Sequence, residues 1–341
     1  MGVKIETPEG NVDVLVDNVD AQVAASHRND EISAAALLKM DFPPIEYVVP
    51  SLIAPGLTLL VAAPKIGKSW LALNLAYQVA TGGRVFGSIP VAARPVLYFA
   101  LEDGYRRLHK RMKHLCFQPT DNLRFITKSA DLDADITDFL TLNEKKRPLI
   151  IIDTLQKYRE TKPVNRSDSA YDRDYAIVGA LQRMAIEAEC AMLVIHHDRK
   201  AAAGDFVQSV SGTNGIAGAA DATITIQRGR VQHEGVLSIT GRDAEENEYS
   251  VEFNDGQWTL QGGSLEQAAG AVVEARAHAR NGDRSNDVLD IVNRSPNGVR
   301  PYQVAGILTD MSSNDAAKYL KRLAERGLIT NPSRGMYMPI S

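Results

Sequence analysis

The stretch that decides the fold is residues 59–76, which read LLVAAPKIGKSWLALNLA. An apolar run comes first, a tight loop ending in Gly67-Lys68-Ser69 follows, and the last residues have the apolar spacing of a helix. This order of strand, loop and helix sets backbone N–H groups and the positive end of the helix dipole to hold a polyphosphate. We therefore expect Lys68 to reach the β- and γ-phosphates and Ser69 to bind Mg²⁺.

The loop departs from the phosphate-loop (Walker A) pattern at its first position, where Ala62 stands in place of glycine. Because alanine tolerates fewer backbone angles than glycine, the loop is expected to open slightly differently. The predicted ligands are ATP and Mg²⁺. The predicted nucleotide-binding residues are consecutive: Ala63, Pro64, Lys65, Ile66, Gly67, Lys68, Ser69 and Trp70.

The bulk composition is that of a soluble globular protein. The chain has 341 residues, enough for about two domains, with 44% hydrophobic and 23% charged residues. Its net charge of -4 means that any nucleic-acid contact must use a local basic surface. Cys116 and Cys190 lack metal-ligand spacing and suggest a reducing compartment. No segment has the length of a membrane span and no signal-peptide pattern is present, so we expect a cytoplasmic protein without membrane contact.

Four segments are predicted along the chain: an N-terminal segment over 1–43, an ATPase domain over 44–260, a partly helical linker over 261–284 and a second domain over 285–341. A short helix is expected from Glu31 to Met40. In the second segment, near-continuous apolar runs alternate with helical patterns, which favours an α/β fold with a doubly wound parallel sheet. The strands are expected at 57–62, 95–101, 148–153, 191–197 and 222–227, the helices near 68–80, 103–115, 133–144 and 170–189. Alternation over 235–260 predicts a final antiparallel hairpin with a turn at Asn254-Asp255-Gly256.

Polar residues at three strand ends carry the expected chemistry. Asp153 ends an apolar strand and is predicted to bind Mg²⁺ together with Ser69. Glu102 follows another strand and is the candidate that activates the attacking water, whereas Asp103 is expected to cap the following helix. The polar run from His196 to Lys200 ends a third strand and is predicted to be a sensor that contacts the γ-phosphate or the catalytic water. His196 and His197 point to opposite faces of the strand, which is poor geometry for one metal ion.

The combination resembles the RepA-type branch of the RecA-like hexameric helicases over roughly residues 44–255. The residues that carry the resemblance are Val48-Val49-Pro50, Pro55 to Leu60, Ala63 to Trp70, Leu97 to Asp103, His196 to Lys200, Ser211-Gly212-Thr213 and Ala219 to Ala222. The resemblance implies a RecA-like P-loop NTPase in which Glu102 activates water and His197 contacts the γ-phosphate. It also implies a homo-oligomeric ring of six with ATP at subunit interfaces, each site completed by an arginine of the next subunit. Arg242 matches that arginine best, with Arg228 and Arg230 as second choices.

Two long polar loops, over 159–168 and 199–209, follow the third and fourth strands. Loops of this length are usually functional or mobile. The resemblance places such loops in the central channel, in contact with single-stranded DNA; plain surface loops are the alternative. The candidate phosphate-binding residues are Lys157, Arg159, Arg166, Arg199 and Lys200.

The last segment is predicted to be a winged helix-turn-helix. Helices are expected at 286–293, 301–308 and 313–326, followed by a strand at 328–330, a turn and a strand at 336–338. Its candidate DNA-binding residues are Lys318, Lys321, Arg322 and Arg334. The segment carries a local net charge of +3, which favours duplex DNA, although such modules also dock proteins.

The function that the resemblance implies is an ATP hydrolase of the DNA helicase or translocase type, ring-forming and acting on single-stranded DNA in replication. Two alternatives stay open. One is a regulatory ATPase in which nucleotide only switches DNA binding through the winged helix. The other is a loader or mediator for a different helicase, which binds single strands without unwinding duplexes itself.

Overall fold

The computed structural model describes residues 32–162, 170–197, 214–228, 232–242, 245–281, 283–308 and 311–340. The chain divides into two units, Met1–Ile45 and Glu46–Ser341. In the described part of the first unit, one helical turn forms, α2 (Ala34–Leu37), capped by the Ser33 side chain. The helix is shorter than predicted because none of its residues is buried, and a short helix without packing is not stable by itself.

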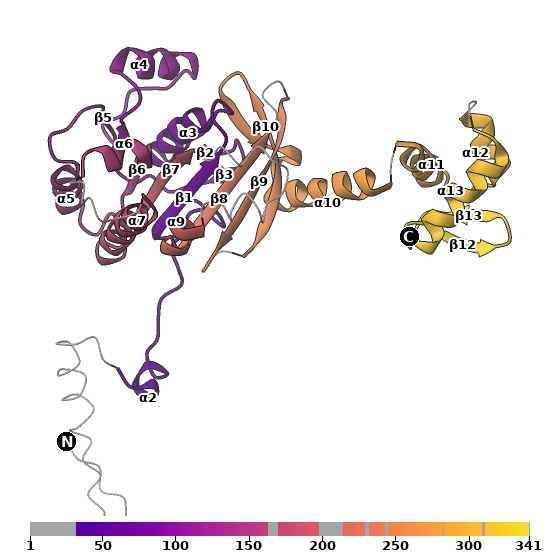
Figure 1. The fold of residues 1–341 in the computed structure, drawn as a ribbon, viewed down its shortest axis with the longest axis horizontal. Helices are drawn as coiled ribbons and strands as arrows, with labels where there is room; N and C mark the ends of the chain where they lie inside the picture. The colour runs from indigo at the N-terminus through magenta and orange to yellow at the C-terminus, as the bar shows by residue number, and fades with distance from the viewer. Residues whose placement is uncertain are drawn as a thin grey trace, which may run out of the picture. The chain divides into compact units, whose positions relative to one another are not determined.

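A nine-stranded sheet forms the centre of the second unit (Figure 1). Its order is β11-β10-β9-β8-β1-β7-β6-β4-β5, and the six strands from β8 to β5 are parallel. The bounds of these six are β1 (Gly56–Ala62), β4 (Val96–Ala100), β5 (Leu123–Ile126), β6 (Leu149–Asp153), β7 (Ala191–His197) and β8 (Ala222–Arg228). The five predicted strands are thus confirmed to within one residue at each end. β5, which pairs with β4, was not predicted because it has only four residues and Arg124 interrupts its apolar run.

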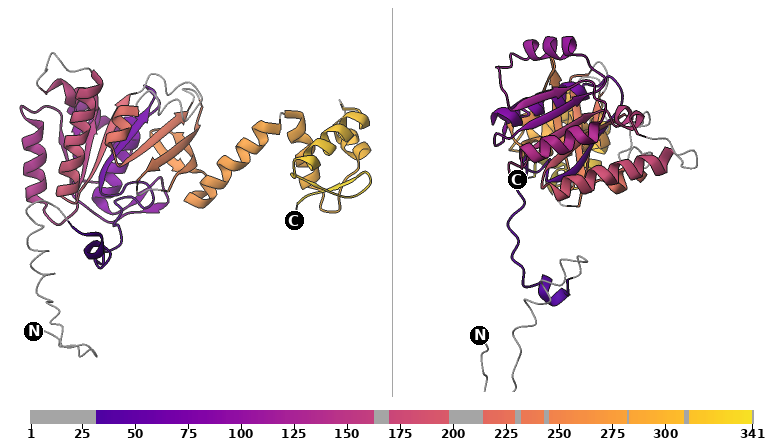
Figure 2. Two further views of the ribbon diagram at one scale, coloured as in Figure 1. Left: turned by 60° about the horizontal axis from the view of Figure 1, so that its bottom comes forward. Right: turned by 90° about the vertical axis from the view of Figure 1, so that its left-hand side faces the viewer.

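Side chains of the parallel strands alternate between two separate cores, one on each face of the sheet. Along β1, Leu60 and Ala62 belong to the core that also contains α3 (Lys68–Thr81), whereas Leu57, Leu59 and Val61 belong to the core with α7 (Ala170–Glu187). Helices therefore cover both faces (Figures 1 and 2), and the predicted doubly wound α/β sheet is confirmed. The remaining helices between these strands are α4 (Tyr105–His114), α5 (Leu132–Leu142), α6 (Leu155–Glu160) and α9 (Asn214–Ala219).

The expected final hairpin is a three-stranded antiparallel extension. β9 (Glu234–Gly241), β10 (Asn247–Asn254) and β11 (Gln257–Leu260) follow β8 in order across the sheet. The turn at Asn254-Asp255-Gly256 is confirmed, with positive φ at Asp255 and Gly256. A small separate hairpin, β2 (Arg84–Val85) and β3 (Ile89–Pro90), was not predicted.

The cap predicted at Asp103 is wrong. Gly104 occupies the N-cap position of α4, and the Asp103 carboxylate instead binds the side chains of Arg107 and Arg111. A carboxylate that bridges two arginine side chains has its hydrogen bonds filled, so it does not need to accept from the backbone N–H groups at the start of the helix.

Residues 261–284, predicted as a linker, begin with a 3₁₀ turn, η2 (Gln261–Gly263), and continue as one helix, α10 (Leu265–Asn281). Ala268 on α10 is fully buried in the core that contains α3 and β10, and Leu265 and Ala269 pack against the same core. The first half of α10 is therefore held by the ATPase domain.

The last segment has a core of its own, made by residues between Val288 and Tyr337. Its elements are α11 (Asp283–Asn293), α12 (Pro301–Ile307), α13 (Ser313–Glu325), β12 (Thr330–Ser333) and β13 (Met336–Met338). The three helices are confirmed, and the Ser312 side chain caps α13. The first strand is displaced from 328–330 to Thr330–Ser333, because the hairpin turns only at Arg334-Gly335, where Gly335 has φ 76°. The order of helices and strands agrees with a winged helix-turn-helix, which stays a prediction.

Substitution Ala268→Asp should lower the free energy of unfolding by about 3 kcal/mol or more, because it places a carboxylate in an apolar core. Val273→Asp, on the same helix at 69% exposure, is the matched control and should change stability by less than about 0.5 kcal/mol. Denaturant unfolding of both variants measures the difference. Equal, small effects would show that α10 does not pack on the sheet.

Candidate functional site

The phosphate loop connects β1 to α3 at the carboxyl edge of the parallel sheet. Gly67 ends the loop in the left-handed region, with φ 106°. A side-chain carbon there would lie 3.2 to 3.3 Å from the rings of Phe253 and Trp258, so glycine is required both by φ and by space. The indole N–H of Trp258 donates to the Gly67 carbonyl at 3.2 Å. The antiparallel extension therefore holds the loop from one side.

Lys68 lies under the loop and is only 3% exposed. Its ammonium donates to the carbonyl oxygens of Ala62 and Ala63 at 2.6 and 2.7 Å. Burial lowers the pKa of Lys68 to about 8, against the opposing attraction of Asp153 and Glu102. Ile66, in contrast, is buried in the core at 2% exposure, so its side chain packs the loop and only its backbone faces the site.

Asp153 ends β6 and is 3% exposed. The Tyr98 hydroxyl donates to its Oδ2 at 2.9 Å, and the Ser69 hydroxyl also bonds to the carboxylate. Among the described residues, Oδ1 of Asp153 has no hydrogen-bond partner. The pKa of Asp153 is raised to about 6, chiefly by burial and also by the nearby charges of Glu102 and Asp103, while the hydrogen bonds from Tyr98 and Ser69 oppose the rise. A buried carboxylate with a free oxygen beside a hydroxyl fits a hydrated Mg²⁺.

Glu102 and His197 complete this edge. Strand register brings their neighbours together, since Ala100 pairs with Asp153 and His197 with Ala62. The Thr154 hydroxyl donates to Glu102 Oε1 at 2.9 Å, and His197 Nε2 lies 3.6 Å from Glu102 Oε2. Burial and then the charge of Lys68 lower the pKa of His197, while Glu102 opposes this, so the ring is neutral at pH 7.

Two arginines enter the pocket beside the loop, and each stacks on aromatic rings. Arg228, at the end of β8, lies 4.5 Å from the Phe253 ring centroid and donates to the Ile66 carbonyl at 2.9 Å. Arg111 of α4 lies 5.2 Å from the Trp70 ring. The pocket measures about 240 Å³ and is lined by Lys65, Gly67, Lys68, Ser69, Trp70, Arg111, His197, Arg228 and Phe253.

Sequence reasoning missed Arg111, because a basic residue in the middle of a helix carries no local signal of what it faces. It treated Arg228 as a second choice for an arginine that acts on a neighbouring subunit. In the structure Arg228 contacts the phosphate loop of its own chain. Arg230 lies outside the described residues.

Arg242 lies at the opposite edge of the sheet. β9 runs antiparallel to β8, so Gly241 pairs with Ala222 at the start of β8, far from the phosphate loop. The Arg242 guanidinium is 3.4 Å from Asp221 and is 61% exposed. Arg242 cannot serve the nucleotide site of its own subunit from this position.

Several of the predicted DNA-binding residues form ion pairs within the protein. Arg159 donates twice to Asp174 at 3.0 Å, and Lys157 pairs with Glu160. Arg166, Arg199 and Lys200 lie outside the described residues. On α13, Lys318 pairs with Asp315 and Lys321 with Glu325, and Arg334 lies exposed in the turn of the last hairpin.

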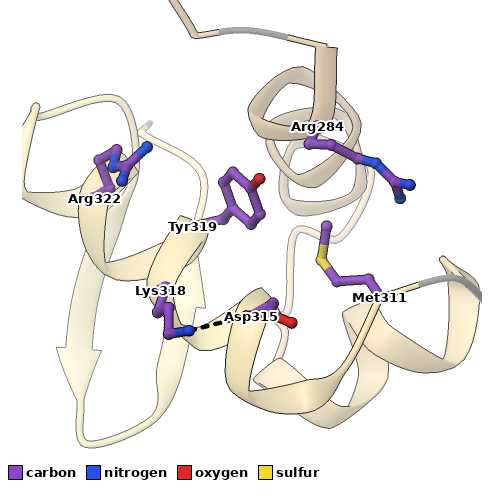
Figure 3. Close-up of a pocket in the computed structure, with 6 residues that line it drawn as sticks. All are labelled: Arg284, Met311, Asp315, Lys318, Tyr319 and Arg322. Carbon is purple, nitrogen blue, oxygen red and sulfur yellow. Dashed lines mark hydrogen bonds and ion pairs between the residues drawn. The ribbon is translucent and has the colours of Figure 1, made fainter.

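A cavity of about 270 Å³ opens beside α13 (Figure 3). It is lined by Arg284, Met311, Asp315, Lys318, Tyr319 and Arg322. The Arg322 guanidinium lies 6.0 Å from the Tyr319 ring, whose plane stands between Arg322 and the helix that carries Arg284 (Figure 3). Three cations and one carboxylate leave this cavity positively charged.

Residues 24–203 match a family model described as an AAA domain, AAA_25, which covers more than half of the chain. The chain belongs to this AAA domain family. A solved DnaB-like replicative helicase, studied with its primase interactions, is similar at a TM-score of 0.51 and 17% identity, over 72% of this chain and 73% of that one. A KaiC-like protein from Pyrococcus horikoshii is similar at a TM-score of 0.44 and 12% identity, over 64% and 99%.

At 17% identity the first likeness concerns the fold alone, and that fold is the RecA-like P-loop NTPase predicted from the sequence. The AAA domain is a nucleotide-dependent ATPase domain, in agreement with the site at the carboxyl edge of the sheet. Within the described residues, no helix combines the length and the apolar character that a membrane span requires.

Asp153→Asn should stabilise the protein in the absence of nucleotide and Mg²⁺. The pKa of Asp153 in the folded protein lies above the ordinary aspartate value of 3.8, so the folded form binds more protons than the unfolded form between about pH 4 and 6. The free-energy cost of burying the ionised Asp153 carboxylate is absent below pH 4, grows as the pH rises through this window, and is complete above pH 6. With about 1.4 kcal/mol per pKa unit, the gain at pH 8 is up to about 3 kcal/mol. Melting temperatures should show a larger gain for Asp153→Asn at pH 8 than at pH 5. The exposed control Asp138→Asn should show no such gain. A lower melting temperature of Asp153→Asn than of the parent at pH 8 would contradict the account.

Proposed function

We propose that the protein is an ATP-dependent DNA translocase or helicase that forms a ring and acts on single-stranded DNA. The observation that carries the ATPase part is the convergence of Lys68, Ser69, Glu102, Asp153 and His197 on one edge of the sheet. A buried cation, a buried carboxylate and a solvent-reachable carboxylate within one site match the needs of phosphoryl transfer to water.

Each residue has a role in this proposal. Lys68 binds the β- and γ-phosphate oxygens, exchanging its two carbonyl partners for phosphate. Ser69 and Asp153 would hold Mg²⁺, which supplies positive charge against the phosphates. Glu102, fixed by Thr154, accepts the proton of the attacking water, and neutral His197 donates a hydrogen bond to the γ-phosphate.

The ring part of the proposal rests on Arg242 and on the first unit. Arg242 can act on a phosphate only across a subunit interface, because its own loop lies at the other edge of the sheet. Between residues 32 and 45, exposed apolar side chains are frequent, with Leu38 at 87% and Phe42 at 63% exposure. Such side chains are typical of an interface, and a second copy of this chain is the partner that the proposal requires.

Glu102→Gln should reduce ATP turnover by about 10² or more while nucleotide affinity changes little, because the amide binds no proton but keeps the shape of the carboxylate. Lys68→Ala should lose nucleotide affinity itself. Steady-state phosphate release and equilibrium binding of an ATP analogue separate the two effects. Full turnover in either variant would refute the assigned roles.

Mixing Lys68→Ala with Arg242→Ala protein should restore ATP turnover that both variants lack alone. In a random ring, about a quarter of the interfaces then combine an intact Lys68 with an intact Arg242 from the neighbour. Turnover of the equimolar mixture, compared with each variant alone, is the measurement. If Arg242→Ala is as active as the parent, or if mixing restores nothing, Arg242 does not act in trans.

A nucleotide-switched regulatory ATPase, or a loader for another helicase, is the second candidate function. The positive cavity beside α13 favours it, because Lys318 and Arg322 there could hold duplex phosphates (Figure 3). Turnover stimulated by single-stranded DNA together with strand separation supports the first function. Nucleotide-dependent duplex binding without strand separation supports the second.

A further inference from the structure

Helix α4 concentrates positive charge at the carboxyl edge of the sheet, where it stands out from the other elements (Figure 1). Its ten residues contain no aspartate or glutamate. They contain five permanent cations, Arg106, Arg107, Lys110, Arg111 and Lys113, and two histidines, His109 and His114. The whole chain has a net charge of -4, so this density is local.

Two of the three faces of α4 have structural partners. Leu108, at 3% exposure, and Met112 pack on the core. Arg107 and Arg111 both bind the Asp103 carboxylate, and His114 contacts Asp255 at 2.8 Å. These contacts fix the helix beside the phosphate loop.

The third face is formed by Arg106, His109, Lys110 and Lys113, which lie within roughly 100° of arc on an α-helix. All four side chains are exposed. Within the described part of the chain, none of them has an ion pair or a side-chain hydrogen bond. We call these four residues the α4 strip.

Helix stability does not explain the strip. Arg106 and Lys110 are separated by four residues and Lys110 and Lys113 by three, spacings at which like charges repel each other. A bound polyanion would remove this repulsion, since it supplies opposite charges along the same line.

The composition of the strip favours nucleic acid over protein. Protein interfaces have an apolar centre and are depleted of lysine, whereas the strip has two lysines, an arginine and a histidine and no apolar side chain. A row of exposed cations on a helix without acidic residues is typical of contact with a phosphate backbone.

We propose that the α4 strip binds the phosphate backbone of single-stranded nucleic acid. The proposal rests on the single-stranded DNA activity proposed above and adds a contact outside the two polar loops. Asp103 follows Glu102 directly and holds Arg111, which lines the nucleotide pocket. The strip and the nucleotide pocket therefore lie on two faces of the same helix.

The test is a triple variant, Arg106→Glu, Lys110→Glu and Lys113→Glu. Its matched control reverses one arginine and two lysines at the opposite edge of the sheet: Arg124→Glu, Lys145→Glu and Lys146→Glu. Fluorescence anisotropy of a labelled oligothymidylate measures affinity over a series of salt concentrations, and melting temperature reports the fold of each variant. If the strip variant is misfolded, the same three positions changed to Gln replace it.

The parent should bind the single strand, and the strip variant should bind it at least about tenfold more weakly. The slope of log affinity against log salt should decrease by about 2, since each lost phosphate contact on a single strand contributes roughly 0.7. The control triple should keep the parent's affinity within about threefold. Equal losses of affinity in both triple variants, or no loss in the strip variant, overturn the proposal for the α4 strip. In that case the parent's binding of the single strand still supports the proposed function. A parent that binds no single strand overturns both.

Discussion

The carbonyl oxygens of Ala62 and Ala63 hold the ammonium of Lys68 in a position that is only 3% exposed. A buried charge is tolerated only beside opposite charge and hydrogen-bond acceptors, so this one position requires Asp153 and Glu102 at the same edge of the sheet. Burial moves the pKa values of Lys68 and Asp153 toward each other, to about 8 and about 6. Phosphate oxygens for Lys68 and a divalent cation for Asp153 would relieve both penalties, so this edge of the sheet is suited to bind them.

The antiparallel extension and α4 surround that edge from two sides. Trp258 and Phe253 support Gly67 and Arg228, while Asp103 orders α4 and thereby Arg111 over Trp70. Arg111 and Arg228 each lie against an aromatic ring and line the pocket. The site thus depends on residues that lie up to about 190 positions away from the loop, as the Trp258 bond to Gly67 shows.

The parallel strands and the phosphate loop were predictable because continuous apolar runs and Gly67-Lys68-Ser69 are local signals. Register then brought the predicted Glu102, Asp153 and His197 together at one edge. Arg111, Arg228 and the packing of Ala268 were not predictable, because each depends on which distant element lies opposite. The preference of aspartate for helix N-termini predicted that Asp103 caps α4. The Asp103 carboxylate instead accepts hydrogen bonds from two arginines of α4. The action of Arg242 on a neighbouring subunit stays a prediction. Its position excludes contact with the nucleotide site of its own subunit.

Both tryptophans of the chain, Trp70 and Trp258, adjoin the phosphate loop, so intrinsic fluorescence reports on this site directly. The most direct measurement is a titration of the protein with a non-hydrolysable ATP analogue and Mg²⁺, followed by tryptophan emission, in the parent and in Lys68→Ala. The account predicts a saturable change in the parent and none at the same concentrations in Lys68→Ala. No change in the parent, or identical curves for both proteins, would contradict the claim that Lys68 holds a nucleotide.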